Sequence, residues 1–159
     1  PIFFLILRIL VNMRLSSPAF EDNGEIPEKY GYTKQDTNPP LQINDVPEEA
    51  ESLVLIVDDP DAVQPAGKIW DHWILFNINP SVEEIKEGDV LGIEGENDYG
   101  EIGYGGPNPP DREHTYVFRI YALDDDLDLS EGVSRSEVDV AMEGKVIEKD
   151  ILEGRFSPI

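Results

Sequence analysis

The sequence contains no cysteine among its 159 residues. Without cysteine the chain has no disulfide framework, no thiolate nucleophile and no cysteine-ligated metal site. Basic residues are also scarce, since 12 lysines and arginines face 34 aspartates and glutamates and leave a formal net charge of −22. A field of that sign repels nucleic acid and anionic membranes, so we expect neither as a partner. No apolar run reaches the roughly 20 residues of a membrane-spanning helix, so stable membrane insertion is not expected either.

The acidic composition also bears on the medium in which the protein works. An acidic surface stays dissolved where salt screens its self-repulsion, because the Debye length falls to about 3 Å at 1 M salt. The charge of −22 is therefore typical of a halophilic or salt-exposed protein. An ordinary acidic protein is an equally simple interpretation.

The length of 159 residues predicts one domain, which would bury roughly 70% of the surface that its unfolded chain exposes. The first twelve residues, PIFFLILRILVN, are mostly apolar. Their β-branched and aromatic content favours an extra or swapped edge strand, and a remnant of a targeting segment is the alternative. We therefore expect an apolar extension at residues 1–12 and a single domain at residues 13–159. The expected location is the cytoplasm, or outside it if the extension is a targeting remnant.

Three short apolar runs predict the core of a sheet. The first extends from Leu53 to Val57, the second is IWDHWILFNI at residues 69–78, and the third is TYVFRIYAL at residues 115–123. All three are rich in β-branched, aromatic or leucine residues, a composition that favours buried strands. Proline and glycine divide much of the remaining chain into short segments. A single mostly β domain is the economical interpretation.

A helical segment is predicted near the C-terminus. Ser134 and Glu137 form a capping box, which marks the start of a helix. Three apolar residues then recur at four-residue spacing: Val138, Met142 and Val146. Gly144 is expected to weaken or break this helix, because glycine is a poor helix former.

The first apolar run is followed by the acidic sequence DDPDA. Pro60 fixes its own φ and biases Asp59 toward an extended conformation, so a type I turn from Asp59 would end the strand. Turn chemistry alone explains these residues. The functional interpretation is that Asp59 and Asp61 lie at the mouth of the sheet and hydrogen-bond an imidazole or a polar ligand.

The chain has two histidines, His72 and His114, and each lies beside an aromatic, strand-like run. A two-residue period gives the second run two faces, with Trp70, His72 and Ile74 on one and Asp71, Trp73 and Leu75 on the other. Either histidine could be an ordinary satisfied core residue. Both also lie near turns rich in glycine and proline, such as GYGGPNPPD at residues 103–111. Glycines there permit close backbone approach and could direct N–H groups at an anion.

A metal site is an alternative interpretation of the same residues. Asp59, Asp61, His72 and His114 are of the types that ligate metals, which keeps open a metal-dependent or acid/base enzyme. The sequence contains no nucleophile elbow, no H-E-x-x-H zinc motif, no Walker loop and no dinucleotide-binding glycine motif. We therefore expect no cofactor and no catalytic residue.

Taken together, these segments resemble the phosphatidylethanolamine-binding protein family, in its bacterial and archaeal Raf-kinase-inhibitor-like branch. The resemblance runs from LSSPAF at Leu15 to GRFSPI at the end of the sequence. It rests on LVLIVDDPDA with a D-P-D signature, DHWILFNI with an H-W strand, YGGPNPP followed by EHTYVFRIYALD, and AMEGKVIEKDILEG. The resemblance implies a mainly β fold, a Greek-key β-sandwich with short helices and a C-terminal helical segment. It also implies a small cavity that binds phosphate or a phosphoryl headgroup.

The resemblance assigns seven candidate ligand-binding residues: Asp59, Asp61, His72, Gly106, Pro107, His114 and Tyr116. It implies that His72 faces His114 across an anion-sized pocket and that Asp59 or Asp61 orients an imidazole. The expected function is non-catalytic binding of a phospholipid headgroup or phosphate-type anion, with modulation of a phosphorylated partner or kinase. A structural protein with a vestigial cavity is a further alternative, and a homodimer is left open.

Two residues depart from the pattern that the family shows. Thr115 stands where many relatives have arginine or another large polar residue, so the chain lacks a potential phosphate-pairing cation at this position. Asn108 stands at a loop position where cysteine is common in this branch. The expected affinity for free phosphate is therefore weak.

Overall fold

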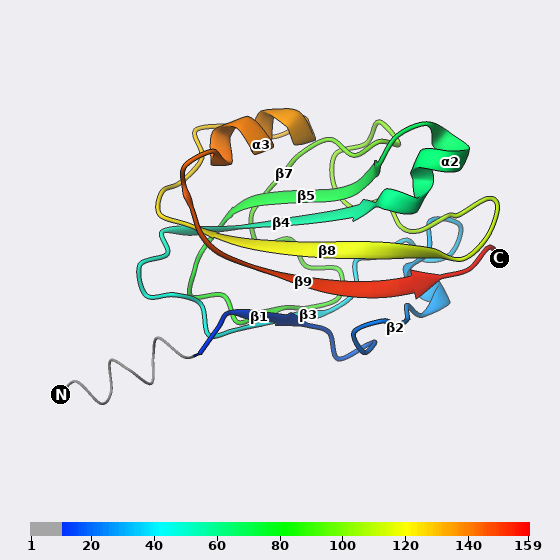
Figure 1. Cartoon of the computed structure of the whole chain (residues 1–159), viewed down its shortest axis with the longest axis horizontal. Coiled ribbons are helices and arrows are strands. Elements are labelled where there is room, and N and C mark those ends of the chain that lie inside the picture. Colours follow the sequence, from blue (N-terminus) through cyan, green and yellow to red (C-terminus); the bar gives the residue numbers. More distant parts are fainter. Residues whose placement is uncertain (1–10) are drawn as a thin grey trace.

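The computed structural model describes residues 11–159, which form two β-sheets with short helices (Figure 1). The smaller sheet has the order β1-β3-β6 and contains β1 (Arg14–Ser16), β3 (Leu41–Asn44) and β6 (Glu84–Ile85). The larger has the order β2-β9-β8-β4-β5-β7 and contains β2 (Gly24–Glu25), β4 (Ser52–Asp59), β5 (Trp70–Ile78), β7 (Ile93–Glu94), β8 (His114–Leu123) and β9 (Val146–Phe156). The helices are η1 (Glu28–Tyr30), η2 (Pro60–Ala62), α2 (Val63–Ala66) and α3 (Arg135–Met142). The mainly β fold predicted from the sequence is confirmed.

The predicted extension at residues 1–12 lies outside the described residues except for Val11 and Asn12, which have no regular secondary structure. Within residues 11–159, no helix combines the length and the apolarity needed to cross a bilayer.

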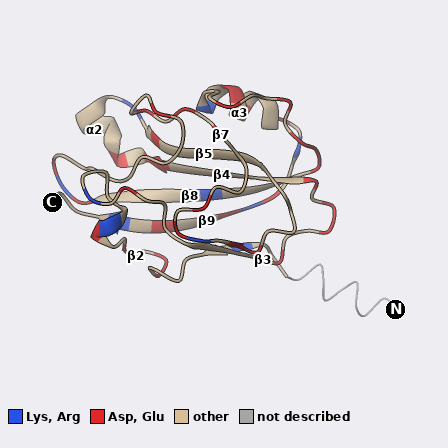
Figure 2. Cartoon of the chain, turned by 180° about the vertical axis from the view of Figure 1, so that it is seen from behind, with Lys and Arg blue, Asp and Glu red and all other residues tan. Residues whose placement is uncertain are grey.

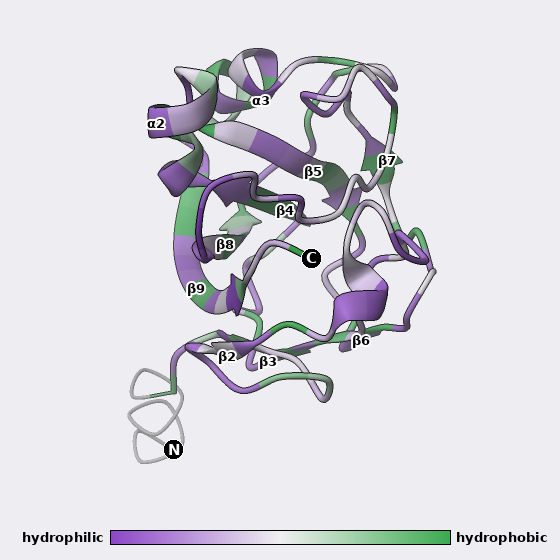
Figure 3. Cartoon of the chain, turned by 90° about the vertical axis from the view of Figure 1, so that its right-hand side faces the viewer, coloured by the Kyte–Doolittle hydropathy of each residue, from purple (hydrophilic) through white to green (hydrophobic). Residues whose placement is uncertain are grey.

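The main hydrophobic core lies between the two sheets, which face each other in Figure 3. Leu41 and Ile43 of β3 pack into it from the smaller sheet, and Leu55, Trp73 and Phe118 pack into it from the larger one. All eight residues of β4 are buried, which explains why its segment Leu53–Val57 is continuously apolar rather than alternating. Each fully buried side chain of this size contributes about 2 kcal/mol to the free energy of unfolding.

The outer face of the larger sheet is covered at one end by α3. Val138 and Met142 of this helix pack against Ile56 of β4 and Ile74 of β5 in a second apolar cluster. The helix begins as predicted, because the Ser134 side chain accepts a hydrogen bond from the backbone N–H of Glu137 at 3.2 Å. The C-terminal helical segment is therefore confirmed over Arg135–Met142.

The predicted helical spacing extends too far, because Val146 begins β9 rather than continuing α3. Gly144 adopts φ +76°, a left-handed conformation that ends the helical path. The chain then pairs antiparallel with β8, with Val146 opposite Leu123. Three of the four exposed residues of β9 are apolar, namely Val146, Ile147 and Ile151, so its sequence lacks a clean alternation and gives only a weak strand signal.

A β-bulge disturbs the regular alternation of β5. Val57 of β4 lies opposite Trp73, whereas the adjacent Asp58 lies opposite Asp71, so His72 is the extra residue. Asp71 contacts α3 through an ion pair, while His72 and Trp73 both lie on the side of the main core. The two predicted faces of this strand are therefore wrong near the histidine, because a bulge shifts the side chains beyond it to the opposite face.

An ion-pair network ties α3 to the sheet beside this bulge. The carboxylate of Asp58, only 1% exposed, lies 2.9 Å from Arg119 Nε and 3.0 Å from Arg135 Nη1. Arg135 Nη1 also lies 2.8 Å from Asp71 Oδ1. Figure 2 shows acidic residues along many surface loops and fewer basic residues. Arg119 and Arg135 lie beside the buried carboxylates of Asp58 and Asp71 and neutralise their charge.

Candidate functional site

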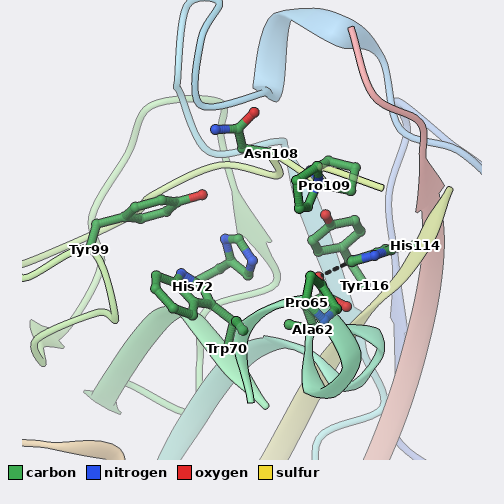
Figure 4. Close-up of a pocket in the computed structure, with 12 residues that line it drawn as sticks. Ala62, Pro65, Trp70, His72, Tyr99, Asn108, Pro109, His114 and Tyr116 are labelled. Atoms are coloured by element: carbon green, nitrogen blue, oxygen red, sulfur yellow. Dashed lines mark hydrogen bonds and ion pairs between the residues drawn. The ribbon is translucent and has the colours of Figure 1, made fainter. Parts of the chain in front are cut away.

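A cavity of about 180 Å³ lies where β4, β5 and β8 meet α2 and the loop before β8 (Figure 4). It is lined by Asp59, Ala62, Pro65, Ala66, Trp70, His72, Tyr99, Asn108, Pro109, Pro110, His114 and Tyr116. The strand ends supply the titratable groups, and the helix and the loop supply mainly apolar walls. The cavity is therefore small and mixed in character, as expected for a site that holds a small polar ligand.

Asp59 ends β4 and is the acid that reaches the cavity. Its Oδ1 accepts a hydrogen bond from the backbone N–H of Asp61 at 2.9 Å, which caps η2. Its Oδ2 lies 2.6 Å from Nδ1 of His114. Burial raises the pKa of Asp59, and the hydrogen bond to His114 only partly offsets that effect. The DDPDA sequence thus forms both the turn and a cavity carboxylate.

His114 begins β8 and has a carboxylate on each ring nitrogen. Nδ1 contacts Asp59, and Nε2 lies 2.7 Å from Oδ1 of Asp111. Two carboxylate acceptors require two N–H donors, which only the doubly protonated imidazolium supplies. His114 is therefore an internal cation whose two N–H groups are both occupied.

His72 differs from His114 in charge state. Its Nδ1 lies 2.7 Å from the carbonyl oxygen of Gly105, so the ring donates there. Complete burial lowers the pKa of His72 to about 4, although the backbone hydrogen bonds act in the opposite direction. The ring is therefore neutral near pH 7, and its Nε2 is a hydrogen-bond acceptor beside the cavity.

Aromatic rings build much of the wall around His72. The ring of Tyr99 lies edge-on to His72 at 5.7 Å and to Trp70 at 5.6 Å between centroids. Tyr116 lies edge-on to His72 at 5.2 Å and tilted to His114 at 6.3 Å. In Figure 4 the Tyr116 ring lies between the two histidines. Both histidines thus line one cavity, but they do not contact each other across it.

Two fully buried polar side-chain atoms of the cavity wall lack a hydrogen-bond partner among residues 11–159. They are the indole Nε1 of Trp70 and the hydroxyl oxygen of Tyr116, and both atoms are buried. A buried donor without a partner costs about 1–3 kcal/mol. Such atoms are expected where a ligand supplies the missing acceptor.

Three of the predicted site residues do not line the cavity. Asp61 accepts a hydrogen bond from the backbone N–H of Thr115 at 2.9 Å and so fixes the start of β8. The backbone N–H of Gly106 donates to Asp36 at 2.7 Å. The Pro107 carbonyl accepts from the backbone N–H of Tyr32 at 2.9 Å. These residues hold the loop in place, and the next residues along the chain form the cavity wall.

Gly106 has a steric role that explains its residue type. A Cβ built at this position would collide with the backbone of Tyr30, Gly31 and Tyr32. Only glycine lets the two loops approach this closely.

Sequence reasoning missed several residues of the site. Tyr99 comes from a loop with no strand or helix pattern, and nothing in the sequence aligns it with β5. The sequence predicts only that Asn108 lies in a loop and Trp70 in a strand, and it assigns neither residue to the site. Asp111 carries a signal that could have been used, because it is an acid three residues before His114.

The residues that could bind a metal are not assembled into a metal site. Within residues 11–159, no group of three or more histidine, cysteine or acidic residues is arranged to hold a metal ion. Asp59 and His114 are in contact, whereas His72 hydrogen-bonds the backbone and Asp61 holds Thr115. Among residues 11–159, no lysine or arginine lines the cavity. The polar groups that line it are hydrogen-bond donors and acceptors.

The fold and the site define a class of protein: a two-sheet β protein with a small polar and aromatic cavity at the strand ends. Residues 16–157 match the family model described as phosphatidylethanolamine-binding protein. A UPF0098 protein of Methanothermobacter thermautotrophicus is 44% identical over 151 residues, which cover 91% of this chain and 98% of the relative. A UPF0098 protein of Chlamydia trachomatis is 44% identical over 148 residues, with the same coverage of both chains.

Solved structures agree with this match. A protein of Chlamydia trachomatis described as a phosphatidylethanolamine-binding protein homolog superposes with a TM-score of 0.87, at 42% identity over 91% of this chain and 97% of its own. The E. coli protein YbcL superposes with a TM-score of 0.85 at 24% identity, over 94% and 99% of the two chains, which shows the shared fold. The chain belongs to the phosphatidylethanolamine-binding protein family. The names of these relatives state no reaction.

Proposed function

We propose that the cavity binds the phosphoryl group of a small phosphate monoester, such as the free phospholipid headgroup phosphoethanolamine, without catalysing its conversion. The observation that carries this proposal is the pair of unpartnered buried groups, Trp70 Nε1 and Tyr116 Oη. Both can donate to oxygen, and a phosphoryl group offers three oxygen acceptors. One bound phosphoryl group would satisfy both donors.

The neutral His72 selects a protonation state of the ligand. Its Nε2 accepts a hydrogen bond, so it complements a P–OH group rather than a bare oxygen. A phosphate monoester carries such a proton below its second pKa, near 6. The preferred ligand is therefore the monoanion, which accepts from Trp70 and Tyr116 and donates to His72.

The affinity for such a ligand is modest, because no lysine or arginine of residues 11–159 lines the cavity. His114 is the cation nearest the ligand, and two carboxylates already oppose its charge. The family name supports a phospholipid headgroup as the ligand class. Modulation of a phosphorylated partner or kinase would use the same recognition, since a phosphorylated side chain presents the same group.

The test is calorimetric titration with inorganic phosphate and with phosphoethanolamine. The wild type is compared with Trp70→Phe and Tyr116→Phe, which remove one donor each and keep an aromatic ring. Tyr104→Phe is the matched control, because the Tyr104 hydroxyl donates to the Tyr30 carbonyl at 2.8 Å rather than to the cavity.

We expect saturable binding of both ligands by the wild type, and phosphoethanolamine should bind about tenfold tighter at pH 6 than at pH 7.5 because its monoanion fraction falls over that interval. Trp70→Phe and Tyr116→Phe should each weaken it about tenfold, and Tyr104→Phe should leave it unchanged. Absence of binding at both pH values would contradict the proposal and favour a vestigial cavity. Binding that appears only after metal addition would favour the metal-dependent alternative.

A further inference from the structure

The two acids on His114 are placed differently. The Asp59 side chain is 4% exposed and is part of the cavity wall, whereas the Asp111 side chain is 37% exposed. Asp59 is also fixed by the backbone N–H of Asp61. Asp111 lies in a segment with no helix or strand. One carboxylate thus belongs to the rigid sheet end and the other to an exposed loop.

Asp111 is joined to the cavity wall by its neighbours in the sequence and by its contact with His114. It directly follows Pro109 and Pro110, which line the cavity wall. Its Oδ1 lies 2.7 Å from Nε2 of His114, a residue that is itself 1% exposed and lines the same cavity. The Asp111 carboxylate is therefore an anion of the chain itself that contacts His114.

The contact between Asp111 and His114 matters because few positively charged groups lie near the cavity. The nearby Arg112 is directed to Asp61, with Nη2 3.5 Å from Oδ1. His72 is neutral, and the cavity wall contains no lysine or arginine. His114 is thus the cation that an incoming anion meets there. With Asp59 and Asp111 both on its ring, the three groups together carry one negative charge.

We propose that Asp111 is an affinity-determining residue that competes with a phosphoryl ligand for His114. Its carboxylate accepts the hydrogen bond that Nε2–H of His114 would otherwise donate to an oxyanion. Its negative charge also opposes the approach of an anion to the cavity. This inference rests on the phosphoryl-binding function proposed above. It assigns to an acidic loop residue part of the weak affinity that we expect of the site.

Two substitutions separate the charge of Asp111 from its hydrogen bond. Asp111→Asn keeps the size of the side chain and an oxygen acceptor for Nε2, but removes the negative charge. Asp111→Ala removes both the charge and the acceptor, so Nε2 becomes free to donate. Asp126→Ala is the matched control, because it removes one exposed acid of the loop after β8, outside the cavity wall.

The experiment is a titration of the full chain with inorganic phosphate at 0.5 M salt, where long-range charge effects are screened. Calorimetry gives the dissociation constant, and ¹⁵N NMR of the imidazoles reports on His114. We expect Asp111→Ala to tighten phosphate binding about tenfold, the effect of freeing one charged hydrogen-bond donor. Asp111→Asn should tighten it less, and Asp126→Ala should change it less than about twofold. In Asp111→Ala, phosphate should also shift the Nε2 resonance of His114.

Unchanged or weaker binding by both Asp111 variants, with normal binding by the wild type, would overturn this inference and leave the proposed function standing. Absence of phosphate binding by the wild type and by both variants would overturn the two together. Thermal unfolding of each variant checks that it folds. If Asp111→Ala does not fold, Asp111→Asn alone decides the outcome, because unchanged affinity in that variant would equally overturn the inference.

Discussion

Nδ1 of His72 lies 2.7 Å from the carbonyl oxygen of Gly105, and this contact fixes which ring nitrogen carries the proton. Because a carbonyl only accepts, Nδ1 is protonated and Nε2 is not. We expect ¹⁵N shifts of His72 to show the Nδ1–H tautomer from pH 8 down to about pH 5. Observation of the Nε2–H tautomer, or titration near pH 6.5, would contradict the assigned acceptor in the cavity.

The buried His72 also makes stability depend on pH. Its pKa is about 4 in the folded protein against 6.5 for an unperturbed histidine, so the unfolded chain binds more protons between these values. The free energy of unfolding should therefore fall as pH falls from 6.5 to 4, by roughly 3 kcal/mol from this residue. It should not change above that window on account of His72.

Urea unfolding of the wild type and His72→Gln as a function of pH measures this contribution. The carboxylates act alike in both proteins, so the difference between the two curves isolates the histidine. Parallel curves from pH 7 to pH 4 would show that His72 is not held neutral by burial.

Tyr116→Phe should separate stability from binding. The hydroxyl of Tyr116 has no partner within residues 11–159, so its removal relieves an unsatisfied buried group and should raise the free energy of unfolding by about 1 kcal/mol. Tyr104→Phe, which loses the hydrogen bond to Tyr30, should lower it by about 1 kcal/mol. Chemical unfolding of the two variants gives both values. Destabilisation by Tyr116→Phe comparable to that of Tyr104→Phe would mean that its hydroxyl is already satisfied in the ligand-free protein.

Several elements of the fold were predicted because their signals are local. The strand at Leu53–Val57 is continuously apolar since both faces of β4 are buried. The start of α3 was found because the Ser134 cap and Glu137 are only three residues apart in the sequence. The strand β9 was missed because its exposed positions include Ile147 and Ile151 as well as charged residues, so it has no clean alternation.

The site was predicted less completely, because it depends on contacts between distant segments. Asp59 and His114 are in contact although they are 55 positions apart in the chain. Only the resemblance to the family predicted that they belong to the same site. The bulge at His72 changes which side chains face the core, and a strict two-residue period cannot reveal it. Tyr99 reaches the cavity from a loop whose path is set by tertiary packing.

Asp58→Ala should test the structural network beside the cavity. Its carboxylate is buried between Arg119 and Arg135, and removing one partner of such a cluster leaves unpaired charge. We expect a loss of about 3 kcal/mol in the free energy of unfolding, at the lower end of values for buried pairs because the arginines are partly solvated. Phosphate affinity should be unaffected in the folded protein.

Thermal and urea unfolding provide the stability values for Asp58→Ala, and calorimetry provides the affinity. Asp139→Ala serves as the control, because it removes an exposed partner of Arg135 that lies 3.1 Å away. That change should cost less than about 1 kcal/mol. Equal losses in the two variants would show that burial of Asp58 adds nothing to its ion pairs.

The most direct test of the central claim follows both histidine rings while a phosphoryl ligand is added. In high salt, imidazole NMR signals are recorded during titration with phosphate and with phosphoethanolamine, and His72→Ala assigns the two rings. Since His72 and His114 line the same cavity, a bound phosphoryl group should shift both signals saturably with one dissociation constant. If neither signal moves at ligand concentrations up to the solubility limit of the ligand, the cavity does not bind phosphoryl groups and the proposed function is wrong.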